Sequence, residues 1–71
     1  MQPEYYKVII NGNPFNCSES MSLRDILLYL RINVNSVIIE YNKNIINSSQ
    51  FDQIYLKPND SLEIITIVGG G

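Results

Sequence analysis

The sequence contains no histidine and only one cysteine, Cys17. Without histidine, the chain cannot supply the nucleophile–histidine pairs that many hydrolases use. The common zinc sites built from several cysteines and histidines are excluded for the same reason. A single cysteine cannot form a disulfide within the chain, which fits a reducing compartment. We therefore expect no metal site and no catalytic centre of these kinds.

Long apolar runs and blocks of like charge are also lacking. No stretch approaches the ~20 apolar residues that span a bilayer, and residues 1–7 do not resemble a signal peptide. The 5 basic and 7 acidic residues are scattered along the chain, whereas a nucleic-acid-binding protein normally shows a basic face. We expect protein partners rather than nucleic acid or membrane, and a monomer when the chain is free. The expected location is the bacterial cytoplasm, or the plastid stroma if the protein is plastid-encoded.

What the chain does have is a clear order of β and α patterns. Residues 5–10 are aromatic and β-branched and predict a strand. Asn11 and Gly12 follow as a hairpin turn, because both tolerate positive φ. Residues 15–18 alternate apolar and polar side chains, which predicts the return strand, with Pro14 tolerated at an edge or at the first strand position.

A helix is predicted after this hairpin. Ser22 and Asp25 have the spacing of a capping box, and an apolar stripe of about three turns follows, made of Leu23, Ile26, Leu27 and Leu30. We expect Asn33 or Asn35 to end the helix. Leu28 lies off the stripe, either as an ordinary exposed residue, which we favour, or as part of a partner-binding patch.

The second half of the sequence predicts three more strands. Residues 36–41 are apolar on both faces, which predicts a buried central strand. A turn at 42–44, a short strand at 45–46 and a helical turn capped near Asn47 come next, before a turn at 58–60. The last strand covers residues 62–68 and is expected to return beside the first strand. This order predicts an α+β β-grasp fold with a mixed sheet of four or five strands and one main helix on one face. The domain would cover residues 1–68 and a flexible glycine tail residues 69–71.

Several of these segments together resemble the ThiS family, the sulfur carriers of thiamine biosynthesis. The resemblance rests on Asn11-Gly12 after the first strand, the helix start at 22–27, the strand and Asn at 37–42, the turn and strand at 56–64, and the terminal residues 68–71. It covers nearly the whole chain. The sequence departs from the family at Lys43 and Asn59, where glycine is common, and at Asn47-Ser48, where Pro-Arg is common.

The resemblance implies both a function and a site. In that family a ThiF-type adenylating enzyme uses ATP and Mg²⁺ to join AMP to the terminal carboxylate. Sulfur from a desulfurase system then replaces the AMP, and the thiocarboxylate donates its sulfur to thiazole synthase. Gly71 would be the covalent site, Gly69 and Gly70 would give reach into the partner channel, and Val68 would anchor the base of the tail. The chain itself would bind no cofactor and would not be an enzyme.

The residue types at the C-terminus suit this chemistry. A terminal carboxyl group has an ordinary pKa of about 3.3–3.7, so it is ionised near neutral pH and can attack the α-phosphate of ATP without a general base. Three extended residues span roughly 10 Å. Glycine has no Cβ, so such a segment can pass through a narrow channel and adopt any backbone angle.

Other functions remain open at this stage. One is a molybdopterin-type sulfur carrier, which shares the fold and the Gly-Gly end but is usually longer. The others are a ubiquitin-like modifier joined to protein lysines and a non-covalent β-grasp interaction module. For Cys17, a sulfur relay or an inter-chain disulfide competes with a place in the core next to Phe15, and we favour the core because unpaired cysteine is commonly buried.

Overall fold

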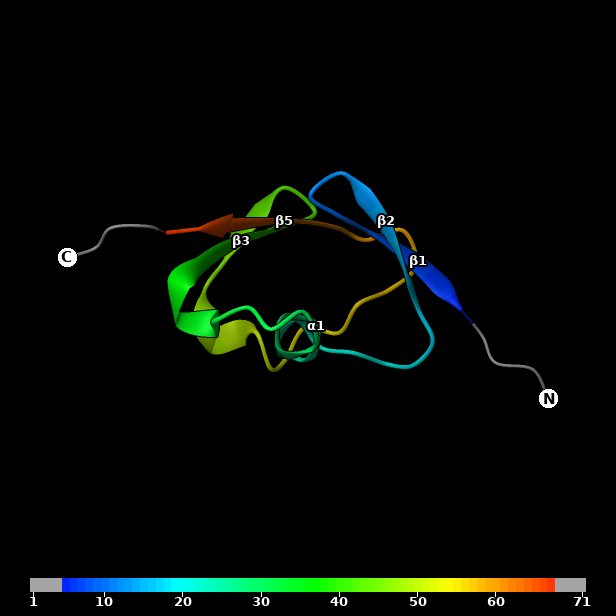
Figure 1. Ribbon diagram of the computed structural model, residues 1–71, viewed down its shortest axis with the longest axis horizontal. Helices are drawn as coiled ribbons and strands as arrows, with labels where there is room; N and C mark the ends of the chain where they lie inside the picture. Colours follow the sequence, from blue (N-terminus) through cyan, green and yellow to red (C-terminus); the bar gives the residue numbers. More distant parts are fainter. Residues whose placement is uncertain (1–4, 68–71) are drawn as a thin grey trace.

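The computed structural model describes residues 5–67, and these residues form a mixed sheet with one α-helix on one of its faces (Figure 1). The elements are β1 (Tyr6–Ile10), β2 (Asn13–Cys17), α1 (Leu23–Tyr29), η1 (Val34–Ser36), β3 (Val37–Tyr41), β4 (Asn44–Ile46), η2 (Ser48–Gln50) and β5 (Ser61–Thr66). The strand order is β2-β1-β5-β3-β4. β5 pairs in parallel with β1, and the other three pairings are antiparallel. The predicted β-grasp fold, with the last strand beside the first, is confirmed.

Turn chemistry explains both hairpins. Asn11 and Gly12 have φ values of 50° and 82°, and Asn42 and Lys43 have 49° and 73°. Two consecutive residues with positive φ form the tight turn whose twist matches that of antiparallel strands. The predicted turn at 42–44 is one residue too long, because Asn44 is already the first residue of β4. The return strand β2 likewise begins at Asn13, earlier than predicted.

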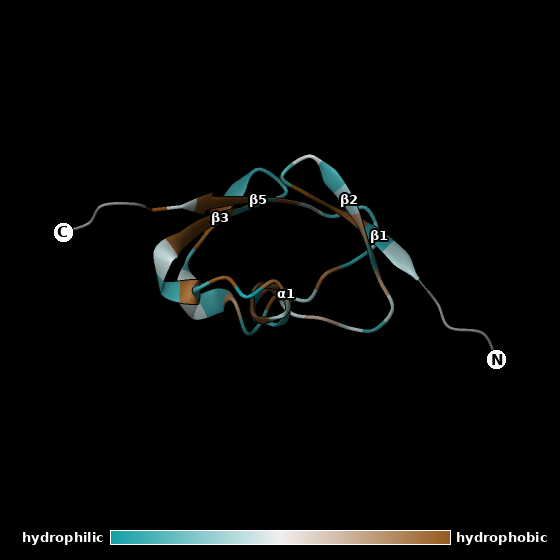
Figure 2. Cartoon of the chain, viewed as in Figure 1, coloured by the Kyte–Doolittle hydropathy of each residue, from teal (hydrophilic) through white to brown (hydrophobic). Residues whose placement is uncertain are grey.

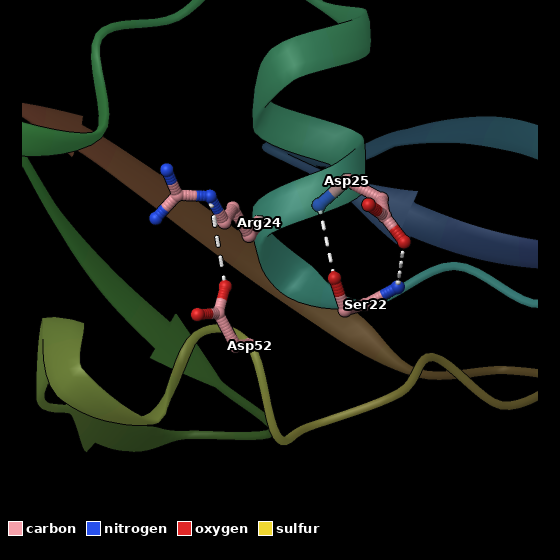
Figure 3. Close-up of polar contacts among 4 residues, drawn as sticks. All are labelled: Ser22, Arg24, Asp25 and Asp52. Atoms are coloured by element: carbon pink, nitrogen blue, oxygen red, sulfur yellow. Dashed lines mark hydrogen bonds and ion pairs between the residues drawn. The ribbon is translucent and has the colours of Figure 1, made fainter.

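The N-terminus of α1 has its first backbone donors paired. The predicted capping box is confirmed: the Asp25 N–H donates to the Ser22 hydroxyl and the Ser22 N–H donates to the Asp25 carboxylate, both at 3.0 Å (Figure 3). Leu23 and Arg24 donate their N–H groups to the carbonyls of Ile54 and Phe51. The first backbone N–H groups of a helix have no acceptor within the helix itself. Here the carbonyls of the segment after η2 accept from two of them.

The prediction that Asn33 or Asn35 ends the helix is wrong. α1 ends at Tyr29, because Arg31 takes a left-handed φ of 61°. The N–H of Arg31 donates to the Leu28 carbonyl and that of Ile32 to the Leu27 carbonyl, which is the Schellman pattern of helix termination. The sequence signal was hidden because glycine usually occupies that position.

The core lies between α1 and the inner face of the sheet. Its largest fully buried side chains are Leu23, Ile26, Leu27, Ile39, Leu62 and Val8. Each such burial is worth about 1.5–3 kcal/mol relative to exposure. The prediction that residues 36–41 are buried on both faces is wrong, since Ile38 is 38% exposed while Val37 and Ile39 are buried. The helix covers only one face of the sheet, so the pattern of a doubly covered strand does not apply.

The turn residue Lys43 gives a first testable prediction. Its φ of 73° lies in the left-handed region, which is unfavourable for residues with a Cβ. We expect Lys43→Gly to raise the free energy of unfolding by about 0.5–1 kcal/mol, measured by urea denaturation. Asn44→Gly, one residue further on in β4, should instead lower it. Equal or lower stability of Lys43→Gly would show that this turn carries no strain.

Candidate functional site

The strand β5 leads toward the predicted site. The site residues Val68, Gly69, Gly70 and Gly71 lie outside the residues that the structure describes. What the structure shows is how the chain is held up to Ile67, the residue before them. β5 lies in the middle of the sheet, with β1 as its neighbour on one side and β3 on the other.

On one side β5 is paired along its length with β3. Five residue pairs join the two strands, from Tyr41–Leu62 to Val37–Thr66. One further hydrogen bond, from the Ile67 N–H to the Ser36 carbonyl at 2.7 Å, continues this pairing beyond the end of the strand. The backbone is therefore held to the folded body up to residue 67.

On the other side the contact with β1 is short and a side chain extends it. β1 pairs with β5 through Ile9 and Ile10, and the Asn11 N–H donates to the Leu62 carbonyl at 2.8 Å before the chain turns away. The Asn11 amide oxygen accepts from the Ile64 N–H at 2.7 Å, and its Nδ2 donates to the Ile64 carbonyl at 3.4 Å. The asparagine amide thus substitutes for a strand residue. Sequence reasoning found the turn role of Asn11 and missed this second role.

The start of β5 is held by a buried carboxylate that sequence reasoning also missed. Asp60, only 6% exposed, accepts from the Tyr41 hydroxyl at 2.7 Å, from Nδ2 of Asn42 at 3.1 Å and from the Lys57 N–H at 2.7 Å. The Asn42 amide oxygen in turn accepts from the Ser61 N–H at 2.8 Å. In the sequence, the only sign of this network was the aspartate in the turn at 58–60. Its partners Tyr41 and Asn42 belong to another hairpin, so no local pattern links them to Asp60.

These hydrogen bonds change the pKa of the Asp60 carboxyl group. Burial alone would raise the pKa of Asp60, but the hydrogen bonds from Tyr41, Asn42 and the Lys57 backbone outweigh it and lower the pKa below the ordinary 3.8. For Tyr41, burial and the hydrogen bond to Asp60 raise the pKa, against a smaller opposing effect of the Lys57 ammonium. That ammonium donates to the Tyr41 hydroxyl at 3.2 Å. The network is a structural clamp at the base of β5, with its carboxylate ionised near neutral pH.

The remaining chemistry of the described residues is sparse. Residues 5–67 contain no group of three or more His, Cys, Asp or Glu side chains that could hold a metal ion. A hollow of about 190 Å³ lies between β2 and α1 and includes Phe15, Cys17 and Met21 in its lining. Cavities that hold small ligands are usually larger, about 300–1,000 Å³. No helix within residues 5–67 is long and apolar enough to cross a membrane.

Cys17 lies in the core, as predicted. Its side chain is 4% exposed and belongs to the buried cluster, and burial raises the pKa of the thiol, with a smaller opposing effect of the Tyr6 hydroxyl. A raised pKa disfavours the thiolate, which is the reactive form. Leu28, the residue off the helix stripe, is 57% exposed.

Comparisons with known proteins agree with this arrangement. The family model described as "ThiS family" matches residues 8–71. The ycf40 protein of Porphyra purpurea is 48% identical over 62 residues, which cover 87% of each chain. A thiazole synthase of Paramagnetospirillum magneticum is 35% identical over 65 residues, which cover 92% of this chain and 20% of the synthase. The crystal structure of a thiamine biosynthesis protein (ThiS) from Geobacter metallireducens superposes with a TM-score of 0.79 at 26% identity, covering 92% of this chain and 99% of that one.

Proposed function

Because the chain belongs to the ThiS family of small sulfur carriers of thiamine biosynthesis, which are not themselves enzymes, we propose that its working group is the terminal carboxylate on Gly71. A ThiF-type enzyme adenylates this carboxylate with ATP and Mg²⁺. A desulfurase system supplies the sulfur that replaces AMP, and the resulting thiocarboxylate gives its sulfur to thiazole synthase. The observation that carries the proposal is the match of the family model, which extends through residue 71. In addition, the chain that leads to this terminus is held to the body up to residue 67.

The bond changes of the proposed reaction balance without a group from the folded body. An oxygen of the Gly71 carboxylate attacks the α-phosphorus of ATP, and pyrophosphate leaves. A persulfide sulfur of the desulfurase system then attacks the acyl carbon, AMP leaves, and reduction of the S–S bond by a thiol releases the thiocarboxylate. The mixed anhydride makes AMP a good leaving group, whereas the free carboxylate has none. The activating enzyme supplies the metal and the cationic groups.

The proposal divides the chain into a folded body and a tail. It is supported by the hydrogen bonds at Asp60, Asn11 and Ile67, which hold β5 to the body up to residue 67. Residues 69–71 form the proposed tail and 1–68 the proposed domain, with Val68 at the tail's base. Gly69 and Gly70 give the reach, because a segment without Cβ atoms fits a narrow channel. Ordering such residues costs roughly 1–2 kcal/mol each, so the body must provide docking affinity.

A direct experiment tests the proposal. The chain is incubated with the cognate activating enzyme, ATP, a cysteine desulfurase, cysteine and a thiol reductant, and its intact mass is measured. We expect a gain equal to the difference between one sulfur and one oxygen atom, placed on the C-terminal peptide by fragmentation. Omission of ATP is the control and should give no gain. An unchanged mass with an activating enzyme that loads another carrier would contradict the proposal.

Two further parts of the proposal concern pathway and location. The match to thiazole synthases supports the thiamine pathway over the molybdopterin pathway, and complementation of a strain lacking its thiazole carrier separates the two. The ycf40 relatives of Porphyra purpurea and Pyropia yezoensis are plastid-encoded, which is consistent with the plastid stroma as the location.

A further inference from the structure

The strand β2 forms one free edge of the sheet, and some of its backbone hydrogen-bonding groups are open there. β1 is its one neighbour in the strand order. In β1, the backbone groups of Lys7 and Ile9 make their hydrogen bonds on the side of β5. Because these directions alternate along paired strands, the residues opposite them in β2, Asn16 and Pro14, direct their backbone groups away from β1. Asn16 therefore offers an N–H and a carbonyl at the edge, and Pro14, which has no N–H, offers a carbonyl.

The described part of the chain leaves these groups uncovered. Within residues 5–67 no backbone hydrogen bond reaches the Asn16 N–H or the carbonyls of Pro14 and Asn16 from another segment, and both residues are exposed. An open edge of this kind is a template for pairing with another strand. The missing donor at Pro14 limits the pairing to a short stretch around Asn16.

A hollow for side chains lies beside the same edge. Phe15 is opposite the buried Val8, so it shares the face of the sheet that packs on α1. Phe15, Met21 and Tyr29 line the hollow between β2 and α1 together with other residues, and Tyr29 is 72% exposed. Figure 2 shows hydrophilic colour on β2, in contrast to the hydrophobic colour over much of β3 and β5. The hollow is smaller than a usual small-ligand cavity, and its size suits an apolar side chain of a neighbouring strand.

The charge of the hollow indicates which kind of segment fits it. Glu19 is the charged residue among those of its described lining, and it is exposed. A lysine or arginine on a bound segment is complementary to this carboxylate. A second copy of the chain is not complementary, because it brings another Glu19. It also brings another Pro14, so donors would be missing from both sides of the ladder.

We call this surface the edge groove, and its members are Pro14, Phe15, Asn16, Glu19, Met21 and Tyr29. It lies away from the end of β5. Tyr6, at the start of β1, is opposite Cys17, at the end of β2, and β5 runs parallel to β1. The end of β2 and the end of β5 are therefore at opposite ends of the sheet, as Figure 1 shows. A protein bound at the edge groove leaves the end of β5 free.

We propose that the edge groove binds an extended segment of a partner protein, which pairs with β2 as an added strand. Main-chain hydrogen bonds to Asn16 and Pro14 give affinity, and the hollow selects the side chains, as in other complexes formed by strand addition. The segment has an apolar side chain next to Phe15 and a lysine or arginine beside Glu19. Antiparallel pairing is slightly the more stable kind, and it places this cation toward the N-terminus of the segment. The site is separate from the proposed carboxylate on Gly71 and does not depend on it.

The experiment titrates a designed peptide into the full-length, isotope-labelled chain and follows the backbone amide signals by NMR. The probe is the acetylated and amidated hexapeptide Lys-Thr-Leu-Thr-Leu-Thr. When it pairs antiparallel with β2, its lysine reaches Glu19, its leucines face the hollow and its fourth residue lies opposite Asn16. We expect saturable shifts centred on residues 14–19, with a Kd at or below about 1 mM. Weaker binding, or shifts centred on another part of the chain, would overturn the proposal.

Removal of single backbone donors tests the added strand. Asn16→Pro removes the outward N–H, and proline is tolerated at a sheet edge because this N–H makes no hydrogen bond to β1. We expect it to weaken Kd about tenfold, the effect of one lost hydrogen bond. Asn16→Thr keeps the N–H and is the matched control, with Kd within about twofold of the wild type. Urea denaturation checks that both variants are folded.

The same test can be made on the peptide, without any change to the protein. Proline in place of its fourth residue removes the N–H that donates to the Asn16 carbonyl, and we expect a similar loss of affinity for the wild type. Equal binding of the two peptides, or of the wild type and a folded Asn16→Pro variant, would overturn the strand pairing.

The charge part of the proposal has its own readout. Glu19→Gln should weaken peptide binding at low salt and flatten the dependence of Kd on ionic strength, because the attraction to the lysine is lost. Glu63→Gln, an exposed glutamate on β5, is the control and should change neither. A salt dependence in Glu19→Gln equal to that of the wild type would overturn the assignment of the cation.

Analytical ultracentrifugation tests the competing occupant. We expect the wild type to sediment as a monomer in the absence of the peptide. A wild-type dimer that Asn16→Pro abolishes, and that the peptide does not dissociate, would show that a second copy occupies the edge groove and would overturn the proposal.

Discussion

Deletion of Gly71 is expected to abolish thiocarboxylate formation while leaving the folded body intact. The reacting carbon would then be that of Gly70, one residue nearer to the body, or roughly 3.3–3.6 Å short of the activating site. Misplacement of reacting atoms by about 1 Å can already cost about 100-fold in rate. Intact-mass measurement after incubation with the activating enzyme, ATP and the sulfur source is the test.

Folding of the truncated chain is expected to be normal, because the described core ends at Ile64. A variant with one alanine appended after Gly71 should also fail to load, since its carboxylate is displaced and the glycine carboxyl before it is no longer free. The same alanine added before Met1 serves as the matched control and should load like the wild type. Normal loading of either C-terminal variant would show that the terminus is not the site.

Replacement of Asp60 by asparagine is expected to have the largest effect on stability. The new side chain would present an NH₂ group to a site where every partner is a donor: the Tyr41 hydroxyl, the Asn42 amide and the Lys57 N–H. Asn42 cannot simply rotate its amide, because its oxygen accepts from the Ser61 N–H. We expect Asp60→Asn to lower the free energy of unfolding by about 2–3 kcal/mol, typical of hydrogen bonds to a charged group. A domain of this size has roughly 4–10 kcal/mol in total.

The pH dependence provides an independent check of this clamp. The folded-state pKa of Asp60 is lowered below 3.8, so its stabilising contribution is complete above that ordinary value. It is lost as the pH falls toward the lowered folded value. The free energy of unfolding of the wild type should therefore fall on acidification below about pH 4, and less steeply in Asp60→Asn. Asp52→Asn, at an exposed ion pair, is the control and should change stability by less than about 1 kcal/mol. Parallel pH curves for wild type and Asp60→Asn would rule out the clamp.

Replacement of Asp60 could affect the proposed loading reaction only through its effect on β5 or through contact with a partner. The clamp holds the first residues of the strand whose far end leads to the proposed site. If its role is to hold β5, Asp60→Asn should lower the unfolding midpoint yet retain loading at temperatures where the variant is folded. Loss of loading in the fully folded variant would instead indicate direct contact with a partner.

Local sequence signals were sufficient for the elements whose cause is local. The hairpin at Asn11-Gly12, the capping box at Ser22 and Asp25 and the turn at 58–60, where Asn59 has a φ of 71°, each depend on residue types a few positions apart. The period of the apolar residues identified the helix stripe. The order of these elements was enough to predict the β-grasp fold.

What sequence alone determined about this protein is therefore its element order and its fold, since both depend on near neighbours; the site at residues 68–71 stays a prediction. Tertiary structure decided the rest. Tyr41 and Asp60 are 19 residues apart and Asn11 and Ile64 are 53 apart, and no local pattern shows that such side chains meet. The exposure of Ile38 has the same origin. Its apolar neighbours predict a buried strand, but the one helix covers the opposite face of the sheet, so the Ile38 side chain is left exposed to solvent.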